Sequence, residues 1–280
     1  MKKYIFASVT ALILVCLGCD LEKEIDIELP DYEQRVVVEA YLEPGQPLRL
    51  LLSLSAPYFE KFPIFEGQFI ENTLVSDAEV SIHYNGQTFQ LNNRLIFDEE
   101  RRKIYNYQHP FVVPEDYDRS FELDILTKAG VRIQASTRLL PPVPIDSLVV
   151  EFREQDTLAR LLTYLTDPPA QDNYYRRLLH SGSLLNQPEQ DFTTSDQIVE
   201  DILLFGTGFE YAAGDTLISS IYHLDIDYYN YLRSVQNAGL ANGNPFAQPS
   251  PIISNVKSDS EKAIGIFTGL SYFRKEVIVE

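Results

Sequence analysis

Apolar and polar residues alternate along much of the first half of the chain. Apolar side chains occupy every second position in residues 35–42, 47–55, 121–125 and 131–135. A period of two residues places all of these side chains on one face of a strand, which is typical of half-buried antiparallel sheets. The pattern therefore predicts a series of short antiparallel strands.

Turn residues separate the alternating stretches. Asn85-Gly86 lies between two of them and favours a tight hairpin, because both residue types tolerate the positive φ angles of a type I′ turn. A second short connection runs through Lys128-Ala129-Gly130. With no helical period in this part of the chain, we predict a mainly β fold with an immunoglobulin- or fibronectin-III-like sandwich over residues 34–140.

A stiff segment with three prolines, residues 139–146, marks a predicted domain boundary. Strand patterns resume after it, at 147–153, 158–166 and 173–181 and near 200–205, 215–224, 262–268 and 272–279. Residues 141–280 therefore form a second predicted domain that is also rich in β-strands.

One helix is predicted in this second domain, near residues 226–238. Asp225 or Asp227 can cap its first turn, and Gly239 follows as a stop signal. Its apolar positions recur at helical spacing: Tyr228, Tyr231, Leu232 and Val235. We expect this face to pack on a sheet.

The amino terminus has the pattern of a secretory signal. Lys2 and Lys3 precede an apolar run over 4–17, which is shorter than the ~20 residues that a membrane span needs. The run ends in Leu17-Gly18-Cys19, which resembles a bacterial lipobox. We predict a signal peptide at 1–18 with lipidation of Cys19; an ordinary signal peptide with an incidental cysteine is the alternative.

An acidic segment over residues 19–33 follows the predicted cleavage site. It resembles a surface-export signal of lipoproteins, and it is equally compatible with a solvated tether on the periplasmic side. The anchor predicts contact with a lipid bilayer through acylated Cys19, because two or three acyl chains hold a protein stably at a membrane.

Composition and charge restrict the classes of function. The chain of 280 residues has 23 basic and 41 acidic residues, for a net charge of −18, so its field repels nucleic acid. Two cysteines and four histidines cannot build a Cys-rich metal centre or a disulfide framework. We expect no nucleic-acid partner, no metal and no cofactor.

Sequence motifs of catalysis are missing from the chain. It contains no P-loop, no dinucleotide-binding glycine pattern, no nucleophile elbow and no His-Glu-x-x-His sequence. Its four histidines are widely separated: His83, His109, His180 and His223. We therefore expect a protein that is not an enzyme, with a hydrolase built on an unrecognised pair of acids as an alternative.

Two charged stretches each have a structural interpretation and a functional one. His223, Asp225 and Asp227 alternate as Ca²⁺ ligands would on a strand, but no glycine-punctuated loop supplies the 6–8 oxygens that Ca²⁺ takes. Helix capping is therefore the favoured interpretation. The acidic run 98–100 and the basic run 101–103 predict a solvated turn, with a protein contact as the alternative.

Two aromatic groups are candidate binding surfaces. The first lies in the long segment between the second and third predicted strands and comprises Tyr58, Phe59, Phe62, Phe65 and Phe69. These side chains could bind a partner, because aromatics dominate interface hot spots, or they could close one end of the sandwich. The second group, Tyr228, Tyr229 and Tyr231, could stack on a sugar or peptide, but helical spacing favours packing.

Several short segments, taken in order, resemble one family. They are Cys19, 24–30, 36–40, 55–58, 75–80, 144–147, 172–176, 244–246, 254–255 and 265–267. Together the chain resembles the domain-of-unknown-function 4249 lipoproteins of Bacteroidetes. This resemblance implies an outer-membrane lipoprotein, of a kind often encoded beside a TonB-dependent receptor, and it transfers no catalytic residues.

Two functional hypotheses follow from these observations. In the first, the chain is a non-enzymatic accessory lipoprotein that contacts a TonB-dependent transporter. In the second, it acts alone and captures a glycan, a peptide or a metal chelate.

Overall fold

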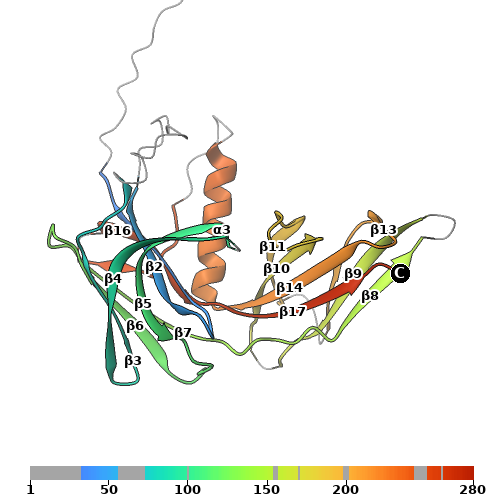
Figure 1. Ribbon diagram of the computed structural model, residues 1–280, viewed down its shortest axis with the longest axis horizontal. Coiled ribbons are helices and arrows are strands. Elements are labelled where there is room, and N and C mark those ends of the chain that lie inside the picture. Colours follow the sequence, from blue (N-terminus) through green and yellow to red (C-terminus); the bar gives the residue numbers. More distant parts are fainter. Residues whose placement is uncertain are drawn as a thin grey trace, which may run out of the picture. The chain divides into compact units, whose positions relative to one another are not determined.

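The structure is a computed structural model and describes residues 33–55, 73–99, 101–153, 157–169, 171–197, 202–242, 251–259 and 261–280 (Figure 1). All of these except residue 33 belong to one unit, Gln34–Glu280. The predicted signal peptide, Cys19 and the five aromatic residues Tyr58, Phe59, Phe62, Phe65 and Phe69 lie outside the described residues.

The predicted mainly β fold is confirmed. The first seven strands are β1 (Val36–Leu42), β2 (Pro47–Leu54), β3 (Glu79–Tyr84), β4 (Gln87–Asp98), β5 (Lys103–Val112), β6 (Ser120–Leu126) and β7 (Arg132–Arg138). Four of them, β1, β2, β6 and β7, lie where alternation predicts strands, and β3 and β4 flank the predicted Asn85-Gly86 hairpin. Two elements from the carboxyl-terminal end join them, β15 (Lys257–Ser258) and β16 (Ala263–Gly269). The nine strands form one sheet in the order β15-β7-β6-β3-β4-β5-β2-β1-β16.

This first sheet curves round a common interior (Figure 1). The long strand β4 joins the strands β15-β7-β6-β3 to the strands β5-β2-β1-β16, because its residues 87–91 pair with β3 and its residues 92–98 pair with β5. The strands β7 and β16 contact each other although they lie toward opposite ends of the sheet order. The inward-facing side chains, among them Leu50, Ile82 and Phe121, are fully buried and form one continuous core.

The parallel pairing of β1 with β16 depends on a glycine. Gly265 has φ +138°, and a Cβ at this position would overlap the carbonyl group of Val38. Side chains rarely adopt such a φ, and only glycine permits so close an approach of two strands. The absence of a side chain at Gly265 thus allows β16, from the carboxyl-terminal segment, to pair with β1 in the first sheet.

The second region consists of two four-stranded sheets. One has the order β11-β10-β14-β17, and the other has β12-β9-β13 with β8 also paired to β9. Their bounds are β8 (Ser147–Phe152), β9 (Leu158–Thr166), β10 (Tyr174–Ser181), β11 (Gln190–Ser195), β12 (Ile202–Gly206), β13 (Tyr211–Ala212), β14 (Thr216–Leu224) and β17 (Ser271–Ile278). Side chains from both sheets, such as Leu165, Leu179 and Ile221, meet in the cores between them.

The helix α3 (Ile226–Asn242) lies where a helix was predicted. Asp225 caps it, because its Oδ1 accepts a hydrogen bond of 2.7 Å from the amide of Tyr228. Tyr228 and Tyr231 are buried as expected. Among the described residues, no helix is long and apolar enough to cross a membrane.

Two details of the predicted helix are wrong. Gly239 does not end it, because the helix continues to Asn242 and simply accepts a glycine at a cost of about 1 kcal/mol relative to alanine. Val235 is 42% exposed, and Ser234 takes the buried position instead. The hydroxyl of Ser234 donates to the carbonyl of Tyr231 and accepts from the amide of Ile253.

Candidate binding cleft

The sheet β11-β10-β14-β17 carries polar and aromatic side chains on the face that points away from its core. Strand alternation explains the arrangement, because Tyr175 and Leu179 of β10 enter the core while Arg176, Leu178 and His180 do not. Tyr222 of β14 and Arg274 of β17 lie on the same outer face.

Residues of the first sheet and of α3 form the other side of a cleft of about 340 Å³. The cleft, called here the cationic cleft, is lined by Tyr41, Arg101, Arg102, Lys103, Tyr105, Arg176, Leu178, His180, Leu184, Asn186, Gln187, Pro188, Asp191, Tyr222, Tyr228, Leu270 and Arg274. Five of these side chains are basic and four are tyrosines. A ligand of moderate size fits a space of this volume.

The turn between β4 and β5 supplies three of the basic residues. Arg102 has φ +53°, and the amide of Arg101 donates a hydrogen bond of 3.0 Å to Asp98. This local geometry directs Arg101, Arg102 and Lys103 to the cleft. The expectation that the turn is only a solvated loop is therefore wrong, because a second part of the chain lies beside it.

Ion pairs hold the basic side chains on this side of the cleft. Arg101 pairs with Glu43 and, at 3.2 Å, with Asp98. The Lys103 Nζ lies 2.8 Å from a carboxylate oxygen of Glu39 and 4.1 Å from the centre of the Tyr41 ring. Burial raises the pKa of Glu39, but the charge and hydrogen bond of Lys103 outweigh it and hold that pKa below its ordinary value.

The opposite side has its own fixed cations. Arg176 donates two hydrogen bonds of 2.7 Å to the two carboxylate oxygens of Asp191. Arg274 donates from Nε to the hydroxyl of Ser220 at 2.9 Å, and its guanidinium lies 4.9 Å from the centre of the Tyr272 ring. Both guanidinium groups are therefore held in defined orientations.

His180 of β10 also lines the cleft, four residues after Arg176 on the same face of the strand. The residue is only 7% exposed, and its Nδ1 has no hydrogen-bond partner among the described residues. Burial lowers the pKa of His180, the charge of Arg274 lowers it further, and Asp191 opposes both effects. The imidazole is therefore neutral at pH 7.

The tyrosines keep their hydroxyl protons. Burial raises the pKa of Tyr41 and Tyr222, and it raises the pKa of Tyr228 to about 12. A protonated phenol donates a hydrogen bond, so these rings add donors to those of the basic side chains. The cleft is thus lined mainly by hydrogen-bond donors.

The other histidines predicted as candidates lie apart. His83 contacts the Thr88 hydroxyl at 2.8 Å, and the His109 ring packs on Phe89. His223 is buried, with Nδ1 2.8 Å from the carbonyl oxygen of Pro141. These contacts assign the three imidazoles to local packing and hydrogen bonding.

The alternating residues His223, Asp225 and Asp227 do not assemble a metal site. The two carboxylate oxygens of Asp225 accept hydrogen bonds from the Tyr228 amide and, at 2.8 Å, from the Thr268 hydroxyl. Within the part of the chain that the structure describes, no group of three His, Cys, Asp or Glu side chains is placed to hold a metal ion. Capping by Asp225, the favoured interpretation, is confirmed.

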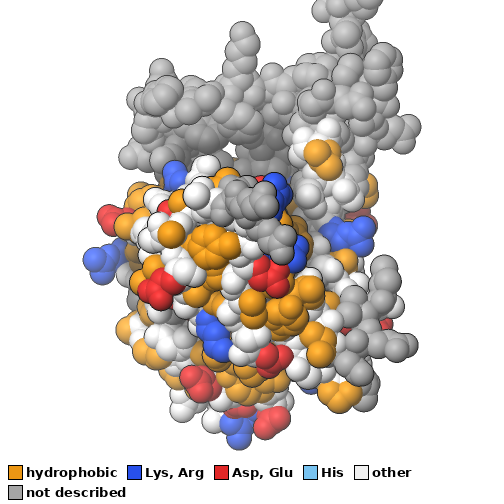
Figure 2. All heavy atoms as spheres, turned by 90° about the vertical axis from the view of Figure 1, so that its right-hand side faces the viewer, with side chains coloured by type: hydrophobic (Ala, Val, Ile, Leu, Met, Phe, Trp, Pro, Cys, Tyr) orange, Lys and Arg blue, Asp and Glu red, His pale blue; other side chains and the backbone are white. Residues whose placement is uncertain are grey.

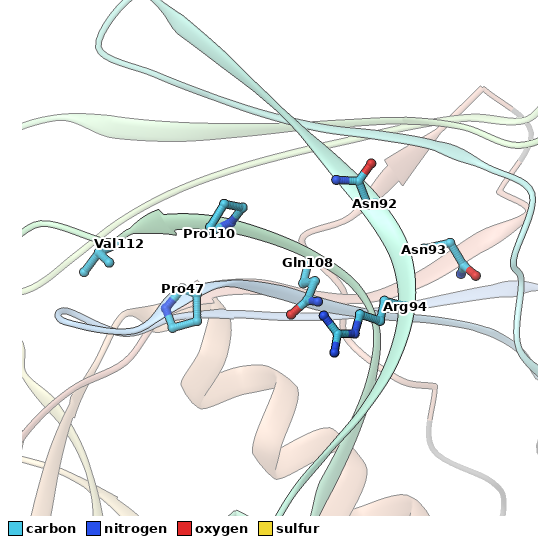
Figure 3. Close-up of a pocket in the computed structure, with 7 residues that line it drawn as sticks. All are labelled: Pro47, Asn92, Asn93, Arg94, Gln108, Pro110 and Val112. Carbon is cyan, nitrogen blue, oxygen red and sulfur yellow. The ribbon is translucent and has the colours of Figure 1, made fainter.

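A second hollow lies on β4 and β5, beside the start of β2, and has a volume of about 710 Å³. Figure 3 shows Arg94 and Gln108 close to each other, with Asn92 and Asn93 along β4. The pairing of β4 with β5 shifts register between Asn93 and Ile96, which bends the strand here. This hollow has a single charged side chain, so the cationic cleft has the stronger chemistry.

Fold and cleft together define a mainly β protein with a cleft lined by basic side chains and tyrosines. A family model described as "Domain of unknown function (DUF4249)" matches residues 22–276. The chain belongs to this family, as its sequence segments indicated. No curated protein matches.

Solved structures resemble the chain only weakly. A cytokine receptor complex has a TM-score of 0.28 at 10% identity, over 69% of this chain and 86% of that one. A DUF4785 family protein from Legionella pneumophila scores 0.25 at 13% identity, over 66% and 52%. A pullulanase from Anoxybacillus sp. LM18-11 scores 0.21 at 12% identity, over 67% and 24%.

Proposed function

We propose that the chain is a non-enzymatic binding protein that takes a small ligand in the cationic cleft. The observation that carries the proposal is the convergence of five basic side chains and four tyrosines on one cleft, in a chain with a net charge of −18. Cations concentrated in this way attract a ligand of opposite charge against the overall field of the protein.

Chemical footprinting of two lysines tests this proposal. Lys103 lies in the cleft with 39% of its side chain exposed, and Lys128 lies on an outer turn with 80% exposed. A low-molecular-mass extract of the same cell envelope is added to the full chain before acetylation. We expect protection of Lys103 and unchanged acetylation of Lys128; equal reactivity of Lys103 with and without the extract would refute the proposal.

We further propose that the protein is held at the outer membrane by lipid on Cys19. The signal-like segment 1–18 and the residue pair Gly18-Cys19 support this anchor. Labelling cells with a palmitate analogue should mark the native chain and should leave a Cys19→Ser variant unmarked. A labelled Cys19→Ser variant, or an unlabelled native chain, would contradict the anchor.

We propose that a TonB-dependent receptor is the partner of this chain, as the family resemblance described in the sequence analysis implies. Gentle crosslinking of intact membranes, followed by affinity purification and mass spectrometry, should recover such a receptor. Recovery of the lipidated chain without any receptor would instead favour a protein that binds its ligand alone.

A further inference from the structure

We infer that the ligand of the cationic cleft is a small oxyanion with at least two negative charges, such as a phosphate monoester. This inference rests on the proposed function and names the chemical class of the ligand. Three observations carry it: the excess of donors, the covered aromatic faces and one unpartnered imidazole nitrogen.

The first observation concerns donors and acceptors. Guanidinium and ammonium groups only donate hydrogen bonds, and the phenols of Tyr222 and Tyr228 add further donors. Carboxylates offset part of this charge, because Asp191 pairs with Arg176, Glu39 pairs with Lys103, and Arg101 pairs with Glu43 and Asp98. The five basic side chains of the cleft still outnumber these four carboxylates. A complementary ligand therefore supplies acceptors, which is what a phosphate or carboxylate group offers.

The second observation concerns the aromatic rings. Lys103 lies over the ring of Tyr41 at 4.1 Å, and Arg274 lies over the ring of Tyr272 at 4.9 Å, measured to the ring centres. Of these two rings only that of Tyr41 lines the cleft, and there Lys103 occupies the position at which a sugar ring or an apolar group would stack. The aromatic residues thus orient the cations, which favours recognition of charge over recognition by stacking.

The third observation is His180, a residue of the cleft lining that is more than nine-tenths buried and whose Nδ1 has no hydrogen-bond partner among the described residues. In the tautomer that carries the proton on Nδ1, this nitrogen is a donor. A buried polar atom without a partner costs free energy, so a group that binds it is favoured. Two charged groups of the same sheet act on this imidazole: Asp191 lies on the adjacent strand β11, and Arg274 lies on β17, two strands away. An oxyanion held by Arg274 lies within the same group of side chains.

The volume restricts the size of this ligand. A cleft of about 340 Å³ lies at the lower end of the range for small-molecule sites. The charged group is therefore carried by a molecule of about the size of a sugar phosphate, either free in solution or at the end of a lipid.

Calorimetric titration of the full lipidated chain in detergent tests the inference. The soluble probes are glucose 6-phosphate, citrate and uncharged glucose, and the lipid probes are vesicles of phosphatidic acid or phosphatidylcholine. We expect binding of at least one of the charged probes, no binding of glucose or phosphatidylcholine, and weaker binding as salt is raised. A free ester or citrate that binds identifies a soluble source, and phosphatidic acid alone identifies a lipid source.

Variants locate the binding. Arg274→Gln should weaken it by about tenfold or more, since a charge-assisted hydrogen bond is lost. Arg102→Gln, at an exposed turn position, is a second variant that leaves the packing intact. Arg160→Gln is the matched control, because Arg160 pairs with Glu151 outside the cleft, and it should bind like the native chain.

Failure of this inference differs from failure of the proposed function. Equal binding of glucose and glucose 6-phosphate, or no binding of any charged probe, overturns the oxyanion inference. The same holds if Arg274→Gln and Arg102→Gln both bind like the native chain. If Lys103 is nevertheless protected by the envelope extract, the cleft binds a ligand of another class and the proposed function stands.

Discussion

The two β regions use the same alternating pattern for different purposes. In the first sheet one face forms a continuous core. In the second region the sheet β11-β10-β14-β17 uses both faces. Its inner side chains pack in the cores between the two sheets, and its outer side chains line one side of the cationic cleft. The comparison teaches that alternation reports which residues share a face, but not what that face contacts.

The two regions also differ in how their buried and partly buried arginine side chains are paired. In the first region Arg49 and Arg101 pair with Asp98 near the surface. In the second, Arg177 is fully buried, and its Nε and Nη2 have no hydrogen-bond partner among the described residues. The face drawn in Figure 2 shows the ordinary case, in which acidic and basic side chains are interspersed among apolar ones.

The largest expected effect concerns the attachment of the carboxyl-terminal segment to the first sheet. Gly265→Ala should lower the free energy of unfolding by more than about 3 kcal/mol, because the new Cβ overlaps the Val38 carbonyl and φ is +138°. Gly130→Ala is the control: its φ is +82°, but the space around it is open, so only about 1 kcal/mol should be lost. Urea denaturation measures both, and equal losses would contradict the account.

A buried amide stabilises the first sheet and should have the next largest effect. The Asn106 side chain accepts from the Leu52 amide at 2.7 Å and donates to the carbonyls of Leu52 and Val75. Asn106→Ala should cost about 2–3 kcal/mol in urea denaturation, because buried backbone groups lose their partners. The exposed Asn92→Ala variant should change stability by less than about 0.5 kcal/mol, and a similar cost for both would argue against this role.

In the second region, replacement of Arg177 should stabilise the protein, whereas the two preceding substitutions destabilise it. Burial lowers its pKa to about 10, so the guanidinium is still charged at neutral pH and its burial is unfavourable. Arg177→Met should therefore raise the free energy of unfolding by about 1–2 kcal/mol. Arg160→Met on the surface serves as the control and should have little effect. A clear loss of stability in Arg177→Met would show that the charge has a partner in solution.

The smallest expected effect is a pH dependence from His223. Burial holds the pKa of His223 below its ordinary value of 6.5, against opposing contributions from Pro141, Asp167 and Asp196. The unfolded state therefore binds more protons, and stability should fall as pH decreases from 7 to 5. His223→Gln should flatten this part of the stability curve, and an unchanged slope would exclude His223 as the cause.

The sequence predicted local structure well and long-range pairing poorly. The strands β1, β2, β6 and β7, the Asn85-Gly86 hairpin and the Asp225 cap follow from periodicity and residue type, which act over a few neighbouring positions. The pairing of β1 with β16 joins segments far apart in the chain, and no local signal specifies it. The predicted contact aromatics at 58–69 and the anchor at Cys19 lie outside the described residues, so both stay predictions.

The cationic cleft was missed for the same reason. It combines Tyr41 and Lys103 of the first sheet with Arg176, Tyr222 and Arg274 of the second region, and each of these looks like an ordinary polar strand position alone. The basic run 101–103 was one available signal, and the pairs of like residues in Tyr174-Tyr175-Arg176-Arg177 were another. The latter segment places one Tyr and one Arg on each face of β10, so the outer face could not be an ordinary apolar surface.

The most direct test of the central claim maps the ligand on the protein by NMR. Backbone amide signals of the full chain are followed while the charged probe that binds best in the calorimetric titration is added. The account predicts shifts at Arg176, His180 and Arg274, with no shifts at Asn92 and Gln108 in the other hollow. Shifts confined to Asn92 and Gln108, or no shifts at all, would contradict it.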